Sequence, residues 1–111
     1  MWMTPLDDGV VTVLGLHGRA DGASADGLDG VLAGLFAHGR MLVVLDLSQL
    51  EYLSSAGLRV LGFWLREFRA AGGGLRLANP GSRVATVLRL SGFVLVFEVH
   101  SSVAEAVAAC S

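Results

Sequence analysis

A buried strand, a short turn with two adjacent serines and an amphipathic helix follow one another over residues 42–68. The segment starts with the apolar run L-V-V-L, which suits a parallel strand that is covered on both faces. Asp46 and Ser48 are typical turn residues and predict that the strand ends there. Either Ser54 or Ser55 can then cap the helix. A strand joined to a helix in this way is the building unit of α/β folds, so the segment favours that class.

Strands and helices are expected to alternate along the rest of the chain, whose 111 residues are the size of one domain. Residues 1–8 are expected to form an edge strand or a loose arm. Further strands are expected at Val10–Leu16, Met41–Leu47, Leu75–Ala78 and Phe93–Val99. Helices are expected at Ala25–Ala37, at Ser55–Ala71, after a cap at Ser82, and after a capping box formed by Ser102 and Glu105. This order predicts an α/β sandwich, with a mostly parallel sheet of four to five strands and about four helices, as a single domain over residues 1–111.

The helix expected at 55–71 has one side that faces the core and one that faces solvent. At about 100° per residue, the core-facing arc comprises Leu58, Leu61, Trp64, Leu65 and Phe68. The outward-facing line comprises Ser55, Arg59, Gly62 and Arg66. Phe63 also points away from the core. An exposed ring can anchor a protein interface, although single exposed apolar residues are also normal.

The helix expected at 25–37, which Asp21 or Ser24 can cap, carries three glycines apart from its apolar face. They are Gly27, Gly30 and Gly34. Each glycine costs up to ~1 kcal/mol relative to alanine in a helix interior. One interpretation is that the weak propensity is tolerated. The other is a smooth surface that lets another backbone approach closely, which leaves a homodimer as an alternative.

The composition excludes several classes of function. All eight basic residues are arginines scattered along the chain and the net charge is −2, so no nucleic-acid-binding surface is expected. Without lysine, the chain has neither a P-loop lysine nor a Schiff-base lysine. No apolar run approaches the ~20 residues of a membrane span, and the N-terminus has no secretory signal pattern. We therefore expect a cytoplasmic protein without direct membrane contact, in which the single Cys110 forms no internal disulfide.

The serine pair has two interpretations. A serine at a helix N-terminus is most often only a cap. It can also be a phosphorylation site, because a phosphate there meets unsatisfied backbone N–H groups and the positive end of the helix dipole. The phosphate would add a charge of about −1.5 to −2. Arg59 lies one helical turn after Ser55 and could pair with it.

The run D-L-S-x-L-x-Y-L-S-S-A-G-L-R-V-L, at residues 46–61, resembles the signature of the STAS family, which includes bacterial anti-sigma factor antagonists. In these antagonists the turn typically reads D-S-S-G or D-S-T-G, and its first serine after the aspartate is phosphorylated by a partner kinase. Matched on Gly57, the phosphoserine falls on Ser55, and Ala56 takes the place of the second Ser/Thr. Ser54 takes the place of the aspartate, which it can replace as a cap but not as a charge, and it becomes a second candidate acceptor.

The resemblance implies a binding module that needs no cofactor. In its unphosphorylated form such a module binds an anti-sigma factor with serine-kinase activity and so releases a sigma factor, and a PP2C-type phosphatase resets it. Asp21, in the segment G-R-A-D, resembles the aspartate of the family's G-E-L-D, which lies near the phosphorylation site. Taken with the exposed helix side, the expected partner-binding residues are Asp21, Ser54, Ser55, Arg59, Phe63 and Arg66. STAS domains also serve as subunits of lipid-transport ABC systems, where the same turn would dock on an ATPase.

An enzyme is the rival from another class, since a serine at a strand–turn–helix corner resembles a nucleophile elbow. The local sequence Y-L-S-S-A-G lacks the first glycine of G-x-S-x-G. The histidines at 17, 38 and 100 have no acid in an orienting pattern. Together with Cys110 they also lack metal-ligand spacing. We therefore expect no catalytic and no metal-binding residues.

Overall fold

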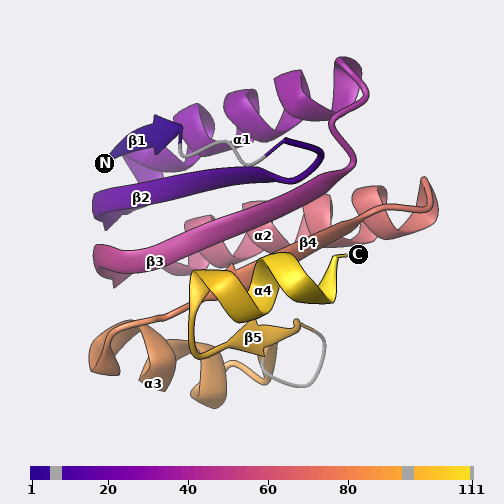
Figure 1. Cartoon of the computed structure of the whole chain (residues 1–111). Coiled ribbons are helices and arrows are strands. Elements are labelled where there is room, and N and C mark those ends of the chain that lie inside the picture. The colour runs from indigo at the N-terminus through magenta and orange to yellow at the C-terminus, as the bar shows by residue number, and fades with distance from the viewer. Residues whose placement is uncertain (6–8, 94–96, 111) are drawn as a thin grey trace.

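The structure is a computed structural model that describes residues 1–5, 9–93 and 97–110 (Figure 1). Its elements are β1 (Trp2–Pro5), β2 (Thr12–Ala20), α1 (Gly22–Ala37), β3 (Leu42–Leu53), α2 (Ser55–Ala70), β4 (Gly74–Ala78), α3 (Ser82–Leu90), β5 (Val99–His100) and α4 (Val103–Ala109). The five strands form one sheet in the order β1-β2-β3-β4-β5. β1 pairs antiparallel with β2 at one edge, and the other neighbours are parallel. The predicted α/β sandwich with a mostly parallel sheet is confirmed.

Helices cover both faces of the sheet. In Figure 1, α4 lies in front of the sheet, and α1 and α2 lie behind it. The larger core lies between the sheet and α1, α2 and α3, and its fully buried side chains include Leu16, Leu28, Leu45, Leu61, Phe68, Leu77 and Leu88. A smaller cluster under α4 comprises Val11, Val13, Val44, Ala78 and Ala106. The strands are therefore apolar on both faces, as the run L-V-V-L predicted.

The central strands β2 and β3 are longer than predicted. They continue through residues 17–20 and 48–53, beyond the ends predicted at Leu16 and Leu47. Each strand supplies backbone partners to the other, in a parallel register that runs to Ala20 opposite Leu53. Asp46 does accept a hydrogen bond from the backbone two residues on, as in a turn, but within the strand. Polar side chains predicted a turn here, whereas strand pairing keeps the backbone extended.

The predicted starts of two helices need correction. α1 begins at Gly22 rather than Ala25, because Asp21 caps it. α3 has Gly81 as its N-cap and Ser82 as its first residue, and no side-chain hydrogen bond caps it. Ser82 was therefore wrongly predicted as the cap.

The strand predicted at 93–99 is confirmed only at its last residue. The backbone N–H of Phe97 donates to the carbonyl of Phe93 at 2.8 Å, a bond that a strand ladder does not contain. Of the described residues in this range, Val99 alone belongs to a strand, and with His100 it pairs with β4. Residues 94–96 of the prediction lie outside the described residues. Phe93 and Phe97 were assigned to a strand because periodicity alone does not separate a strand from other buried segments.

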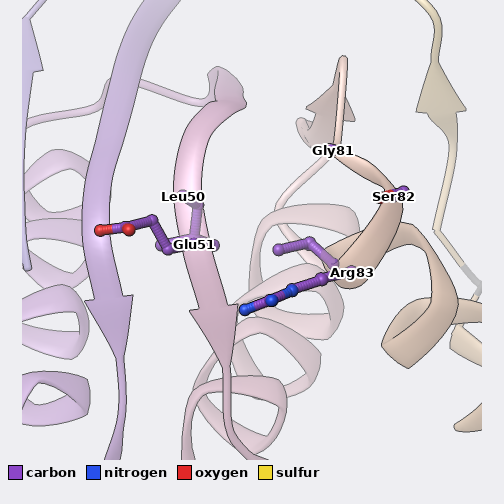
Figure 2. A pocket seen from close by; sticks show the side chains of 6 residues that line it. Leu50, Glu51, Gly81, Ser82 and Arg83 are labelled. Carbon is purple, nitrogen blue, oxygen red and sulfur yellow. The ribbon is translucent and has the colours of Figure 1, made fainter.

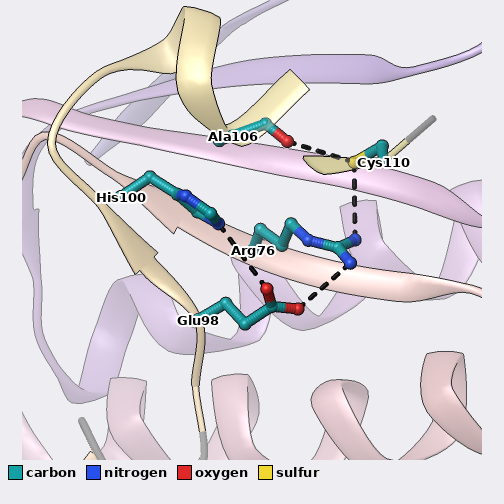
Figure 3. A network of polar contacts seen from close by, with 5 residues as sticks. All are labelled: Arg76, Glu98, His100, Ala106 and Cys110. Atoms are coloured by element: carbon teal, nitrogen blue, oxygen red, sulfur yellow. Dashed lines mark hydrogen bonds and ion pairs between the residues drawn. The ribbon is translucent and has the colours of Figure 1, made fainter. Parts of the chain in front are cut away.

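A polar network ties α4 to the sheet (Figure 3). A guanidinium nitrogen of Arg76, on β4, lies 3.0 Å from a carboxylate oxygen of Glu98, and another donates to the Cys110 sulfur at 3.4 Å. The Cys110 thiol in turn donates to the carbonyl of Ala106 at 3.4 Å. The imidazole of His100 lies 3.9 Å from the other carboxylate oxygen of Glu98. This network fixes the end of the chain over β4 and β5.

Candidate phosphorylation and partner-binding site

The two serines at the start of α2 have different environments. Ser54 is the N-cap, and its hydroxyl accepts a hydrogen bond from the backbone N–H of Gly57 at 3.2 Å. Its own N–H donates to the carbonyl of Ala20 at 2.8 Å, and its carbonyl accepts from the N–H of Leu58 at 2.9 Å. Ser54 is half-buried. It is therefore a structural cap that connects the end of β2 to the start of α2.

Ser55 is the first residue of α2 and is exposed to solvent. Within the described residues its hydroxyl forms no hydrogen bond. The first turn of α2 contains no acidic residue, so no carboxylate of α2 itself lies at the positive end of the helix dipole. The geometry therefore leaves the Ser55 hydroxyl accessible and places it where added negative charge is favourable.

Gly57 allows α2 to begin close to β2. A Cβ at this position would lie 2.8 Å from a methyl carbon of Leu53 and 3.1 Å from the carbonyl oxygen of Ala20. The methyl group is at the end of a flexible side chain, but the carbonyl belongs to the backbone of the adjoining strand. Packing at the serine turn therefore favours a residue without a side chain.

Asp21 lies next to this turn because it follows Ala20, whose carbonyl accepts the hydrogen bond from the N–H of Ser54. Its carboxylate accepts from the backbone N–H of Ser24 at 3.1 Å, and the Ser24 hydroxyl accepts from the N–H of Asp21 at 2.9 Å. Hydrogen bonds from the Ser24 backbone and side chain lower the pKa of Asp21, and the nearby Arg19 acts in the same direction. The prediction that Asp21 caps α1 is confirmed. Its position beside the serines agrees with a place at the site.

A groove between α1 and α2 starts at the serine turn. Its volume is about 320 Å³, and it is lined by Gly22, Ala25, Asp26, Asp29, Ala56, Arg59, Val60 and Phe63. Phe63 is 46% exposed and meets the Trp64 ring edge-on, with 5.0 Å between centroids. The Trp64 indole N–H donates to an Asp29 carboxylate oxygen at 2.7 Å. The groove thus combines an accessible aromatic ring with carboxylates on one wall and Arg59 on the other.

Asp26 and Asp29 are site residues that the sequence analysis missed. They are exposed on α1, spaced three residues apart, and therefore on one face of the helix. Their spacing was visible in the sequence, but only the packing of α1 against α2 brings them opposite Arg59.

The structure separates Arg66 from the rest of the predicted partner-binding residues. Arg66 lines a different hollow, between α2 and the end of α3, together with Gly62 and Phe93. Gly62 was predicted to face outward, but it is buried because the ring of Phe93 covers it. Asp21 and the two serines thus lie at the start of α2, and Arg59 and Phe63 line the groove that begins there, whereas Arg66 lies farther along α2 and lines the other hollow.

The carboxyl ends of β2, β3 and β4 meet at one edge of the sheet, so α1, α2 and α3 all begin there. A second hollow at this edge, of about 310 Å³, lies between the end of β3 and the first turn of α3. In Figure 2, Arg83 extends toward β3, whereas Glu51 extends toward β2. Nearby, the Arg19 guanidinium lies 4.3 Å from the ring centroid of Tyr52, which is 39% exposed. This edge therefore carries the positive ends of three helix dipoles, exposed arginines and an exposed tyrosine.

The histidines lie apart from the serine turn in their described contacts. His38 contacts the carbonyl of Gly34 through Nδ1 at 2.8 Å, and His100 belongs to the network under α4. His17 lines a shallow hollow with Ser48 and Glu51. Over residues 1–5, 9–93 and 97–110, no group of three or more His, Cys, Asp or Glu side chains is arranged to hold a metal ion. In the same residues, none of the helices has the length and apolar character needed to cross a membrane.

Gly27, Gly30 and Gly34 share a side of α1 that no other described element covers closely. A Cβ at Gly27, Gly30 or Gly34 would have no heavy atom of another element within 4 Å. The surface is therefore smooth and available, as one interpretation of the sequence required. A homodimer through it stays a prediction.

The STAS domain family model matches residues 1–106 of the chain. The chain therefore belongs to the STAS domain family, as its run at residues 46–61 indicated. Among the relatives it resembles is the "Putative anti-sigma factor antagonist BtrV" of Bordetella bronchiseptica, which is 39% identical over 94 residues, or 85% of this chain and 81% of the relative.

Solved structures show the same fold. An anti-sigma factor antagonist from Mycobacterium paratuberculosis superposes with a TM-score of 0.90 at 23% identity, over 98% of this chain and 92% of that one. The Bacillus cell fate determinant SpoIIAA, in its phosphorylated form, superposes with a TM-score of 0.76 at 18% identity, over 99% of this chain and all of that one (100%).

Proposed function

We propose that this protein is an anti-sigma factor antagonist that is switched by phosphorylation of Ser55. The observation that carries the proposal is that the two serines at the start of α2 differ: Ser54 caps the helix, and Ser55 is exposed. A kinase can therefore reach the Ser55 hydroxyl without breaking the cap. The relationship to anti-sigma factor antagonists supports the same function.

The unphosphorylated protein would bind an anti-sigma factor with serine-kinase activity through the edge where α1 and α2 begin. The groove offers the Phe63 ring as an apolar anchor, surrounded by Asp26, Asp29 and Arg59. Aromatic anchors with a charged rim are typical of protein interfaces. Sequestration of the anti-sigma factor would release its sigma factor, which places the protein's action in the cytoplasm.

Phosphorylation would change the charge of this surface by about −1.5 to −2. The phosphate would be stabilised by the N-terminus of α2 and by Arg59, one turn away. Arg59 would then turn toward the phosphate. The partner would meet a more negative surface and a rearranged groove and would dissociate, and a PP2C-type phosphatase would restore binding. In this mechanism Ser55 is a substrate of the kinase and not a catalyst.

The test is tandem mass spectrometry of the protein isolated from its own cells, together with Ser55→Ala and the matched control Ser54→Ala. We expect phosphate on Ser55 that disappears in Ser55→Ala and persists in Ser54→Ala. Phosphate on Ser54 alone would move the switch to the cap and overturn the assignment.

Co-purification identifies the partner. We expect Ser55→Ala to retain an anti-sigma factor kinase, and Ser55→Glu to lose it. If the peptide stays unmodified under every growth condition and an ABC-transporter ATPase co-purifies instead, the proposal fails and a docking subunit of a lipid-transport system becomes the better function.

A further inference from the structure

The hollow beside Arg66 is distinct from the serine turn. It has a volume of about 390 Å³ and lies between the second half of α2 and the end of α3. Gly62 at its floor follows Ser55 by seven residues, which corresponds to about 10 Å along the helix axis. The volume falls within the range of about 300–1,000 Å³ that is common for small-molecule sites.

The floor of the hollow is apolar. Leu65 is 5% exposed, and Phe93 is half-buried and stacks on Phe97 with 5.6 Å between ring centroids and 25° between planes. Because Gly62 has no side chain, the Phe93 ring lies directly on the backbone of α2, and a Cβ at Gly62 would be 3.2 Å from its Cζ. A glycine inside a helix costs about 1 kcal/mol relative to alanine. Here that cost is explained by the close approach of the ring.

The rim of the hollow is basic. Arg66 and Arg69, one turn apart in sequence on α2, both line it and both are exposed. Ser91 and Gly92 also line it, and no carboxylate is among the described residues of the lining. Within the described residues Arg66 forms no hydrogen bond or ion pair. An anion that enters the hollow therefore meets the Arg66 guanidinium without a competing acid among the described residues of the lining.

We propose that this hollow binds a small amphiphilic acid, such as a medium-chain aliphatic carboxylate. Its hydrocarbon part would lie on Phe93 and Leu65, and its carboxylate would accept hydrogen bonds from Arg66 and Arg69. The planar guanidinium matches a carboxylate in two-point geometry, and the apolar floor adds binding through burial of the chain. This proposal does not depend on the proposed switch at Ser55.

The test is a titration of ¹⁵N-labelled protein with octanoate, followed by amide chemical shifts. We expect the shifts to concentrate at Gly62, Ser91 and Gly92. Octanol, which has the same chain without the charge, should bind about tenfold or more weakly, since a hydrogen bond to a charged group contributes about 1.5 kcal/mol or more.

Arg66→Gln should weaken the binding of octanoate by a similar factor and leave the binding of octanol unchanged. The matched control is Arg89→Gln, which removes an exposed arginine at the end of α3 that does not line the hollow. Gly62→Leu should fill the floor and prevent binding of both compounds.

Three results would overturn the proposal. The first is an absence of shifts at the hollow. The second is equal binding of octanoate and octanol, which would show that the arginines do not recognise the acid. The third is an equal loss in Arg66→Gln and Arg89→Gln, which would show attraction by the overall charge rather than by this site. Arg66→Gln lies on the helix surface, so it keeps the test valid even if Gly62→Leu does not fold.

Discussion

Replacement of Ser54 by alanine should destabilise the protein, whereas the same replacement of Ser55 should not. The Ser54 hydroxyl satisfies the backbone N–H of Gly57, which has no partner within the helix. Alanine leaves that N–H without its acceptor at a half-buried position. Ser55 forms no such bond within the described residues, so its loss removes no cap.

The magnitude follows from the measured range for N-caps. Loss of a serine cap costs about 0.5–2 kcal/mol, typically about 1 kcal/mol. The backbone bond from Ser54 to Ala20 survives the substitution, so we expect about 1 kcal/mol rather than the upper end. For a domain of this size, that corresponds to a decrease in melting temperature of about 4 °C. Ser55→Ala should change the free energy of unfolding by less than about 0.5 kcal/mol.

The assay is urea unfolding followed by far-ultraviolet circular dichroism, with both variants measured beside the parent protein. Ser54→Asp is the matched control, because aspartate caps as well as serine and its charge suits the helix N-terminus. It should retain the parent's free energy of unfolding.

The reasoning would be refuted if Ser55→Ala were the more destabilised variant, or if Ser54→Ala unfolded at the same urea concentration as the parent. Either result would mean that Ser54 is not the cap. The assignment of Ser55 as the accessible hydroxyl would then no longer hold.

Three further predictions concern the stability of the fold. Folding lowers the pKa of Asp21, so the ionised carboxylate stabilises the protein above its unfolded pKa, and this contribution is lost as the pH falls through the folded pKa. In Asp21→Asn, the free energy of unfolding should therefore decrease less steeply as the pH is lowered through the acidic range. Gly73→Ala should lower the free energy of unfolding by about 1–3 kcal/mol or more in urea titrations, because a Cβ there would overlap the backbone carbonyl of Met41. Trp64→Phe keeps the apolar ring but loses the bond to Asp29, and should cost about 1 kcal/mol with no change in the urea dependence of unfolding.

The start of α2 could be predicted from the sequence because its signals are local. The apolar run before it, the serine pair, Gly57 and the helical period of the apolar residues lie within one stretch of the chain. Ser54 as the cap and Ser55 as the exposed serine remained undecided, since either residue has the chemistry of a cap. The hydrogen bond of Ser54 with Gly57 decides between them.

The ends of β2 and β3 could not be predicted from either segment alone, because each strand extends as far as the other pairs with it. Polar residues such as Asp46 and Ser48 favour turns, but a parallel neighbour satisfies the backbone and keeps it extended as far as Leu53. The prediction failed in the opposite direction at Phe93, because contact of its ring with Gly62 of α2 explains an apolar side chain there without strand pairing.

The sequence by itself determined the α/β class, the order of the elements, the serine turn and the exposed position of Phe63. These properties follow from periodicity and capping, which relate residues a few positions apart. Only the tertiary structure decided that Asp26 and Asp29 face Arg59 across a groove, and that Gly62 and Arg66 belong to a separate hollow under Phe93. Such groupings join residues of different elements, and they arise from how helices pack on the sheet, which no local pattern encodes.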